Sequence, residues 1–102
     1  MTINGIDRIR DFEKAHPLAC RPLSRWCSVV RAARWSHFGD VRETFGPASP
    51  LKLPDGKNVV IFNVGGNKFR LIACIQYQTG LVVVRRVLTH DEYDTGKWKD
   101  EP

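Results

Sequence analysis

The sequence predicts an α+β fold in which an N-terminal helical hairpin packs on a small antiparallel β-sheet, with a short helix at the C-terminal end. Three observations predict it. Apolar residues recur with helical spacing in the first third of the chain, β-branched residues dominate after Gly56, and a helix-capping motif follows the last strand. With 102 residues, 42% of them apolar, we expect residues 1–102 to form a single domain around one small core.

The predicted hairpin comprises two amphipathic helices. Ile6, Ile9 and Phe12 recur at three-residue spacing, and their helix should end near His16 because a proline follows it. A second helix should begin around Pro22, a residue that the first turn of a helix tolerates. Its buried face follows the i, i+3, i+4, i+7 pattern through Leu23, Trp26, Cys27 and Val30. The basic residues of this helix, Arg21, Arg25 and Arg31, then point largely away from the core.

Three strands are predicted after an irregular, proline-containing section at 36–56, in which only a short helical turn around 40–45 is expected. The strands span 58–64, 68–78 and 81–88, and their hairpin turns lie at Gly65-Gly66 and Thr79-Gly80. If the second turn has two residues, Arg70 lies opposite Thr89. The sheet needs one covered face, which the two helices can supply.

The C-terminal helix is predicted from the capping box T-x-x-E, which begins at Thr89. On this helix Tyr93 and Asp94 fall three and four residues after His90, on the same side. Asp94 could orient the imidazole, and Tyr93 could stack on a base or donate a hydrogen bond. The alternative is a surface histidine at a helix start and an aromatic residue at the edge of the core.

The net charge of +5 is unevenly distributed. Residues 17–39 contain four arginines and no acid, and residues 56–90 contain five cations and no acid. Such segregation suits binding to nucleic acid or to an acidic protein, although an ordinary solvated surface is an equal alternative.

The composition disfavours several other classes of protein. No segment approaches the roughly 20 apolar residues that cross a bilayer, and the N-terminus lacks the features of a signal peptide, so we expect a cytoplasmic protein. The odd count of cysteines (Cys20, Cys27 and Cys74) favours free, buried thiols, with a catalytic thiol or a metal ligand as the alternative. The histidines are not paired at i, i+4, so no metal is expected, and no GxSxG or phosphate-loop motif is present.

The cationic strands and His90 could together cleave RNA without a metal. The ribose 2′-hydroxyl is then the nucleophile, so the protein must supply a base, an acid and cations that stabilise the phosphoryl oxygens. Histidine can transfer protons near pH 7, and arginine offers bidentate donors to phosphate. The alternative is that Lys68 and Arg70 are solvated strand residues and that Asn67 is a turn residue.

Two motifs resemble the HigB family of bacterial toxins. Residues 60–73, VIFNVGGNKFRLIA, are similar to its signature FNVGGNxxRhxA, where h is apolar. Residues 87–98, VLTHDEYDTGKW, are similar to its closing motif hTHxEYDxGxW. The resemblance implies a RelE-like fold with a short strand near the N-terminus, for which residues 2–4 are the candidate. It implies an endoribonuclease that cleaves mRNA, typically in the ribosomal decoding site, without a metal or organic cofactor. The implied partner is a HigA-like helix-turn-helix antitoxin.

The resemblance also implies roles for individual residues. Arg70 matches the arginine at the start of the central strand, and His90 and Tyr93 lie where such toxins have their C-terminal catalytic group. We therefore predict Arg70, His90 and Tyr93 as catalytic. The predicted RNA-binding residues are Lys57, Lys68, Asn67, Arg86, Arg21, Arg25 and Arg31, of which the last three would contact ribosomal RNA. Ile61 and Asn63 stand roughly where RelE has paired lysines, which leaves the general base open. The rival hypothesis is a non-catalytic RNA- or protein-binding module.

Overall fold

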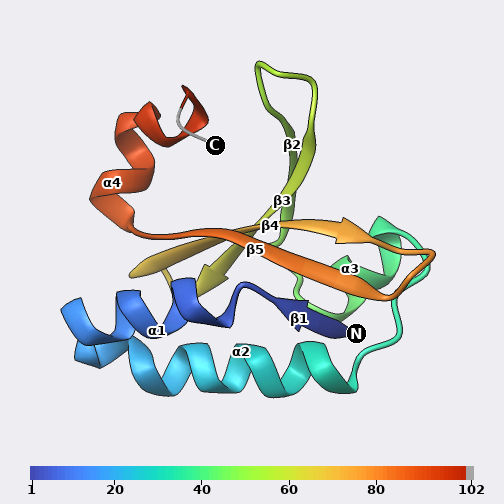
Figure 1. The fold of residues 1–102 in the computed structure, drawn as a ribbon, viewed down its shortest axis with the longest axis horizontal. Coiled ribbons are helices and arrows are strands. Elements are labelled where there is room, and N and C mark those ends of the chain that lie inside the picture. The colour runs from blue at the N-terminus through green and yellow to red at the C-terminus, as the bar shows by residue number, and fades with distance from the viewer. Residues whose placement is uncertain (101–102) are drawn as a thin grey trace.

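The computed structural model describes residues 1–100 and confirms the predicted α+β fold (Figure 1). The first half contains β1 (Thr2–Asn4), α1 (Ile6–Ala15), the 3-10 helix η1 (Pro17–Ala19), α2 (Cys20–Ala32) and α3 (Phe38–Thr44). The second half contains β2 (Ser49–Lys52), β3 (Asn58–Val64), β4 (Phe69–Gln76), β5 (Leu81–Thr89), α4 (His90–Thr95) and the 3-10 helix η2 (Lys97–Asp100). Among the described residues, the helices are too short or too polar to cross a membrane.

The sheet is larger than predicted, with five strands in the order β1-β5-β4-β3-β2. β1, the strand implied by the family resemblance, runs parallel to β5, and the other neighbouring strands pair antiparallel. The sequence analysis missed β2, whose Pro50 favoured an irregular segment. β2 is an edge strand, where a proline is tolerated because one side of the strand needs no partner.

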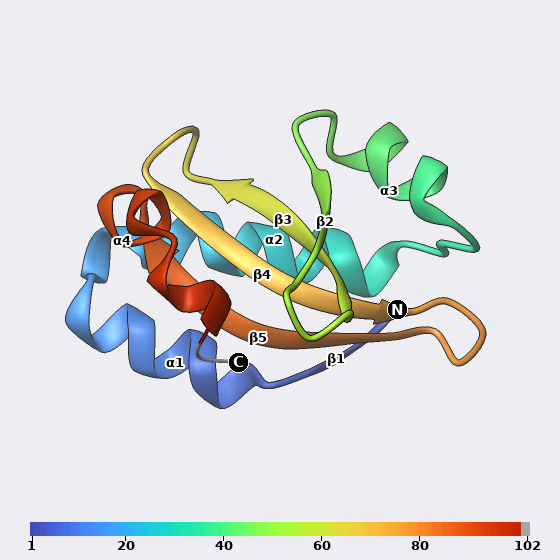
Figure 2. The same cartoon turned by 90° about the horizontal axis from the view of Figure 1, so that it is seen from above.

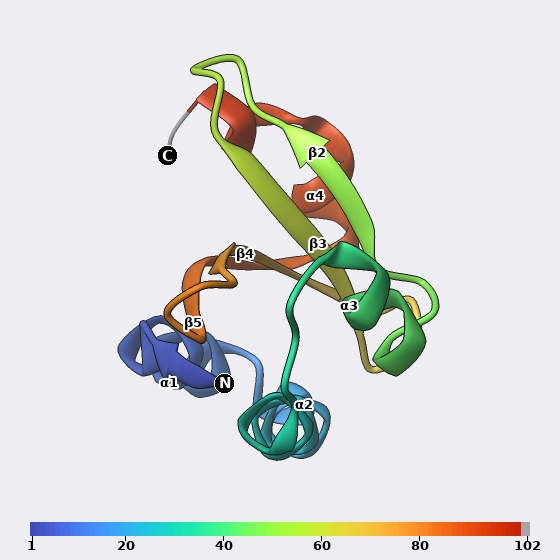
Figure 3. The same ribbon diagram turned by 90° about the vertical axis from the view of Figure 1, so that its right-hand side faces the viewer.

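The two faces of the sheet are covered by different elements. α1 and α2 run antiparallel beneath one face, whereas α4, η2 and the β2–β3 hairpin rise from the other (Figures 1 and 3). Seen from above, α4 and the tip of that hairpin lie over the sheet, with α2 behind it (Figure 2). Gly5 allows the turn from β1 into α1, because its φ is 96° and a Cβ there would lie 2.7 Å from the Val84 carbonyl oxygen.

Each face has its own apolar cluster. The helix-side core combines Leu23, Trp26 and Val30 of α2 with Phe62 of β3 and Leu71 of β4. The opposite cluster comprises Leu53, Val59, Ile61, Ile72, Leu88 and Trp98, with Tyr93 packed against it. Because neighbouring strand residues point to opposite faces, burial on both sides explains the nearly continuous apolar run of β3 and β4.

The register of the β4–β5 hairpin differs from the prediction. Gln76 rather than Gln78 pairs with Leu81, so the turn has four residues, and a bulge follows between Ile72 and Ala73. Arg70 consequently pairs with Leu88 instead of Thr89. A bulge adds one residue to one strand, and nothing in the local sequence marks its position.

The three cysteines differ in exposure, so their reactivity tests the fold. Cys20 is exposed, contrary to the prediction of a buried thiol, whereas Cys27 is buried and Cys74 is half-buried. Burial raises the pKa of the Cys27 thiol, an effect that the positive charge of Arg31 partly offsets. At neutral pH Cys27 is therefore protonated as well as covered, and both properties slow its reaction with electrophiles.

We expect iodoacetamide to alkylate Cys20 first and Cys27 only when the chain unfolds. Mass spectrometry of peptides after timed labelling, with and without urea, measures the order. Alkylation of Cys27 as fast as Cys20 under native conditions would contradict the packing of α2 described above.

Candidate functional site

The site is built around the start of α4. Thr89 caps the helix as predicted: its Oγ1 accepts a hydrogen bond from the Glu92 N–H (3.2 Å), and Glu92 Oε1 accepts one from the Thr89 N–H (2.9 Å). The His90 N–H donates to the Lys68 carbonyl oxygen at 3.0 Å. These bonds tie the first residue of α4 to the β3–β4 turn, so the backbone of His90 has a fixed position beside that turn.

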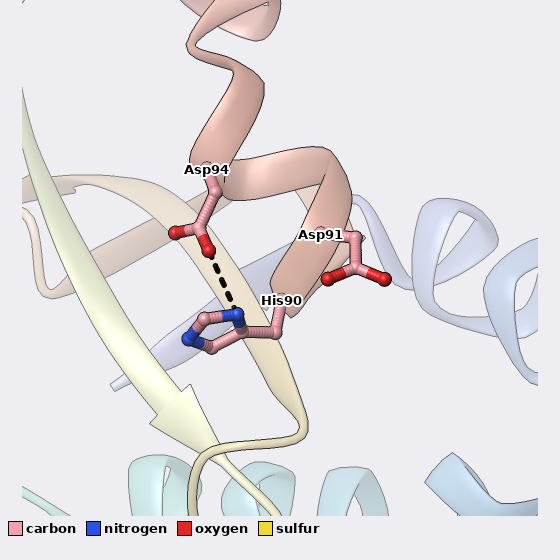
Figure 4. A group of neighbouring side chains, drawn as sticks. All are labelled: His90, Asp91 and Asp94. Atoms are coloured by element: carbon pink, nitrogen blue, oxygen red, sulfur yellow. Dashed lines mark ion pairs between the residues drawn. The ribbon is translucent and has the colours of Figure 1, made fainter.

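The imidazole of His90 is held by an acid one helical turn later. His90 Nδ1 lies 2.9 Å from Asp94 Oδ2, and both side chains remain accessible, at 45% and 57% exposure (Figure 4). A carboxylate beside Nδ1 favours the tautomer with the proton on Nδ1, which leaves Nε2 as a proton acceptor. Within residues 1–100, Nε2 makes no hydrogen bond.

Asp91 adds a third potential metal ligand that the sequence analysis did not anticipate. Donor atoms of His90, Asp91 and Asp94 all lie within 4.8 Å of one another. These three residues occupy the first, second and fifth positions of α4. A search for paired histidines does not detect this spacing. Figure 4 shows Asp91 on the other side of the helix start from Asp94. Since Asp94 already holds Nδ1, orientation of the imidazole accounts for that carboxylate without a metal.

Arg70 is buried, with 8% of its surface exposed. Its Nη1 donates to the carbonyl oxygens of Asn67 (3.2 Å) and Phe69 (3.1 Å), and its Nη2 donates to Asn67 Oδ1 (3.4 Å). The guanidinium carbon lies 5.5 Å from the centroid of the Tyr93 ring. Arg70 therefore connects the β3–β4 turn to α4. Its hydrogen bonds go to Asn67 and Phe69 of the protein itself.

Tyr93 lies in a column of stacked groups. Its ring is 5.5 Å from that of Trp98 and tilted by only 20°, and Trp98 Nε1 donates to the Tyr93 carbonyl oxygen at 3.1 Å. Lys99 Nζ in turn lies 5.8 Å from the Trp98 ring centroid. Because Arg70 and Trp98 both contact the ring, packing restricts access to it, and the hydroxyl is the group of Tyr93 best suited to chemistry.

The β3–β4 turn requires its two glycines for their backbone conformation. Gly65 and Gly66 have φ values of 65° and 69°, a region that other residues rarely adopt. A Cβ on Gly66 would meet nothing within 4 Å, so the constraint there is conformational rather than steric. The turn leaves the side chains of Asn67 and Lys68 exposed beside the start of α4.

Other predicted RNA-binding residues on this face lie farther along the sheet. Lys57 precedes β3 and lines a groove of about 820 Å³ with Cys74, Gln76 and Arg85. β3 has seven residues, so Lys57 lies on the order of 20 Å along the strand from the β3–β4 turn. Arg86 is half-buried on β5, opposite Ile72.

Arg85 was not selected from the sequence, although it belongs to the same acid-free stretch as Arg86. Its Nη1 lies 3.6 Å from Cys74 Sγ, on the sheet face that carries α4. Strict strand alternation would direct only one of these neighbouring arginines to that face, whereas the bulge disturbs the alternation. The remaining predicted residues, Arg21, Arg25 and Arg31, are exposed on α2, across the sheet from α4.

The structure thus brings Arg70, Asn67, Lys68, His90 and Tyr93 together at one end of the sheet. Comparison with known proteins then identifies the family. Residues 19–96 match the HigB toxin family, described as the RelE-like toxic component of a toxin-antitoxin system. The chain belongs to this family.

Curated relatives in this family match over a shorter segment. The chain is 44% identical over 34 residues to the mRNA interferase toxin HigB of Escherichia coli K12 and to the mRNA interferase HigB of Shigella flexneri. The alignment covers 33% of this chain and 33% of each relative. The similarity thus spans about a third of the length of these HigB proteins.

The contacts of Arg70 predict a structural role that can be measured. Arg70→Ala should lower the free energy of unfolding by about 2–4 kcal/mol, because it removes buried hydrogen bonds and leaves their acceptors unpaired. Urea denaturation followed by circular dichroism measures the change.

Lys68→Ala is the matched control, since Lys68 is an exposed cation two residues away and should change stability by less than about 0.5 kcal/mol. Equal stability of the Arg70→Ala chain and the parent would show that Arg70 does not hold the turn.

Proposed function

We propose that this chain is the toxin of a type II toxin–antitoxin pair and that it cleaves mRNA on the ribosome, in the cytoplasm, as a metal-independent endoribonuclease. The observation that carries the proposal is the exposed His90–Asp94 pair beside the cationic β3–β4 turn. This pair lies within the region that matches the HigB toxin family, and the relatives named mRNA interferases support the choice of substrate.

The proposed reaction uses the ribose 2′-hydroxyl as its nucleophile. His90 Nε2 accepts the proton of this hydroxyl while its oxygen bonds to the adjacent phosphorus, and Asp94 stabilises the imidazolium that forms. The bond from phosphorus to the 5′-oxygen breaks, and the Tyr93 hydroxyl donates a proton to that leaving oxygen. The products are a 2′,3′-cyclic phosphate and a 5′-hydroxyl, and the proton balance is restored by exchange with solvent.

The surrounding cations have distinct proposed roles. Lys68 and Asn67, both exposed in the turn, bind the phosphate at which cleavage occurs. Arg70 adds positive charge close to the reacting groups while its hydrogen bonds hold the turn and its guanidinium supports Tyr93. Lys57 and Arg86 contact flanking RNA farther along the sheet. Because phosphate contacts of this kind release counterions, RNA binding should weaken as salt concentration rises.

The partner that we propose is a helix-turn-helix antitoxin of the HigA type. Membership in a family of toxins that act within toxin-antitoxin systems supports an antitoxin of some kind. The proposal that ribosomal RNA contacts Arg21, Arg25 and Arg31 concerns the other side of the molecule and remains a prediction from the sequence.

The catalytic proposal is tested by single-turnover cleavage of mRNA on purified translating ribosomes. His90→Ala should lower the cleavage rate by about 10²–10⁴, because the proton acceptor is lost. Asp94→Asn should lower the maximal single-turnover rate by about tenfold or more, with little effect on the toxin concentration that gives half of that rate, because the imidazole remains but is no longer oriented and stabilised.

Asp91→Asn is the matched control for Asp94→Asn, since both remove one exposed carboxylate from α4. We expect cleavage to persist in this variant and in the presence of EDTA. Loss of cleavage under both conditions would instead indicate a metal bound by His90, Asp91 and Asp94. RNA binding without cleavage by the parent chain would support the rival hypothesis of a non-catalytic binding module.

A further inference from the structure

A second concave surface lies on the helical side of the molecule. It is a pocket of about 420 Å³ between α2, the end of β3, the β3–β4 turn at Gly65 and Gly66, and the segment after α3. Trp26, Val29 and Phe45 contribute its apolar lining, and Arg21 and Arg25 contribute its charged groups. None of the cleavage-site residues His90, Tyr93 and Asp94 lines this pocket, and α4 lies across the sheet from it.

One side of the pocket is an unpaired edge of the sheet. The β2–β3 ladder ends at Ile61, although β3 continues to Val64. Within the described part of the chain, residues 62–64 therefore have a strand neighbour only on the β4 side. Asn63 and Val64 line the pocket beside this edge. An open edge of this kind can pair with an extended segment of another protein.

The indole of Trp26 is a buried donor without an acceptor in residues 1–100. Trp26 is only 2% exposed, and its Nε1 makes no hydrogen bond. The other indoles differ, because Trp35 Nε1 donates to Thr44 Oγ1 (3.0 Å) and Trp98 Nε1 donates to the Tyr93 carbonyl oxygen (3.1 Å). The Trp26 nitrogen is covered by protein, and its ring packs edge-to-face on Phe62 with 5.4 Å between centroids, so Trp26 presents an apolar surface to the pocket.

The charge of the pocket limits what can bind there. Arg21 and Arg25 are exposed, and no acidic residue contributes to the lining. A ligand that complements the surface carries negative charge, a bulky apolar group and backbone able to pair with a strand.

We propose that this pocket binds an extended, acidic segment of the antitoxin protein. The segment pairs with β3 at residues 62–64, inserts one apolar side chain against Trp26, Val29 and Phe45, and aligns carboxylates with Arg21 and Arg25. RNA would complement only the charge of Arg21 and Arg25, because a phosphate backbone cannot form the regular ladder of hydrogen bonds that a peptide forms with a strand edge. The lining, charge and open strand edge of the pocket support a binding surface, and the identity of the partner rests on the proposed toxin function.

This location has a consequence for inhibition. Because the pocket and His90 lie on opposite sides of the sheet, the segment bound in the pocket leaves His90 uncovered. The location does place the segment beside the β3–β4 turn, because Gly65 and Gly66 line the pocket and Asn67 and Lys68 follow them directly.

The experiment is a binding titration with the purified protein encoded beside this gene, using the His90→Ala chain so that cleavage does not interfere. Arg21→Glu combined with Arg25→Glu should weaken binding by about tenfold or more, because the attraction becomes repulsion. Arg31→Glu, a charge reversal on the same helix but outside the pocket, should change the affinity by less than about threefold. Thermal unfolding of each variant checks that the fold is intact.

The three indole N–H signals in a ¹⁵N-correlated NMR spectrum give a second, local readout. Binding should shift the Trp26 signal strongly and leave that of Trp98, which packs on Tyr93, nearly unchanged. A shift of Trp98 without Trp26, or equal effects of the α2 variants inside and outside the pocket, would overturn the proposal.

Ribosomal RNA is the competing occupant, and the same variants distinguish it. If the double variant retains the protein partner but loses binding to purified ribosomes, the arginines contact RNA and the proposal is wrong. If no complex with the neighbouring protein forms, the partner is wrong. Neither result bears on RNA cleavage by His90, which the single-turnover assay tests separately.

Discussion

The arrangement at the candidate cleavage site depends on the buried guanidinium of Arg70. It donates to Asn67 and Phe69 and lies against the ring of Tyr93, so one side chain connects the β3–β4 turn with α4. The His90 N–H provides a second connection through the Lys68 carbonyl oxygen. With both ends of α4's first turn fixed, the short helix can present the His90–Asp94 pair at a defined position, although its six residues would not form a stable helix alone.

Apolar residues are buried on both faces of the sheet, so this small domain can pack helices and position functional side chains on either side of it. Phe62 and Leu71 belong to the helix-side core, while their neighbours Ile61 and Ile72 belong to the cluster beneath Trp98. The second cluster anchors the C-terminal segment through Trp98, which stacks on Tyr93. The apolar contacts of the second face therefore hold the same aromatic residue that Arg70 contacts, and stability and site geometry depend on shared residues.

The sequence was informative where the determining interactions are local. The capping box at Thr89 and Glu92 lies within four residues, and it predicted both the helix and the pairing of His90 with Asp94. Features set by distant parts of the chain were not predictable. The strand containing Pro50 forms only because β3 offers it an edge, and the bulge at Ile72/Ala73 shifts Arg70 to pair with Leu88. The burial of Arg70 is likewise tertiary, since a lone arginine in a strand gives no local sign of which contacts will surround it.

The two acid-free stretches of the chain place their cations on opposite sides of the sheet and meet at the β3–β4 turn, where Gly65 and Gly66 line the same pocket as Arg21 and Arg25. Residues 56–90 supply Lys68 and Arg70 beside His90, whereas residues 17–39 supply the arginines of α2 across the sheet. A single continuous basic face would have to serve RNA and protein partners by competition. With His90 on one side of the sheet and the pocket on the other, a segment bound in the pocket leaves the imidazole open but lies beside the turn that carries Asn67 and Lys68. Net charge alone could not distinguish these cases, because it records how many cations the chain has and not which side of the β-sheet they occupy.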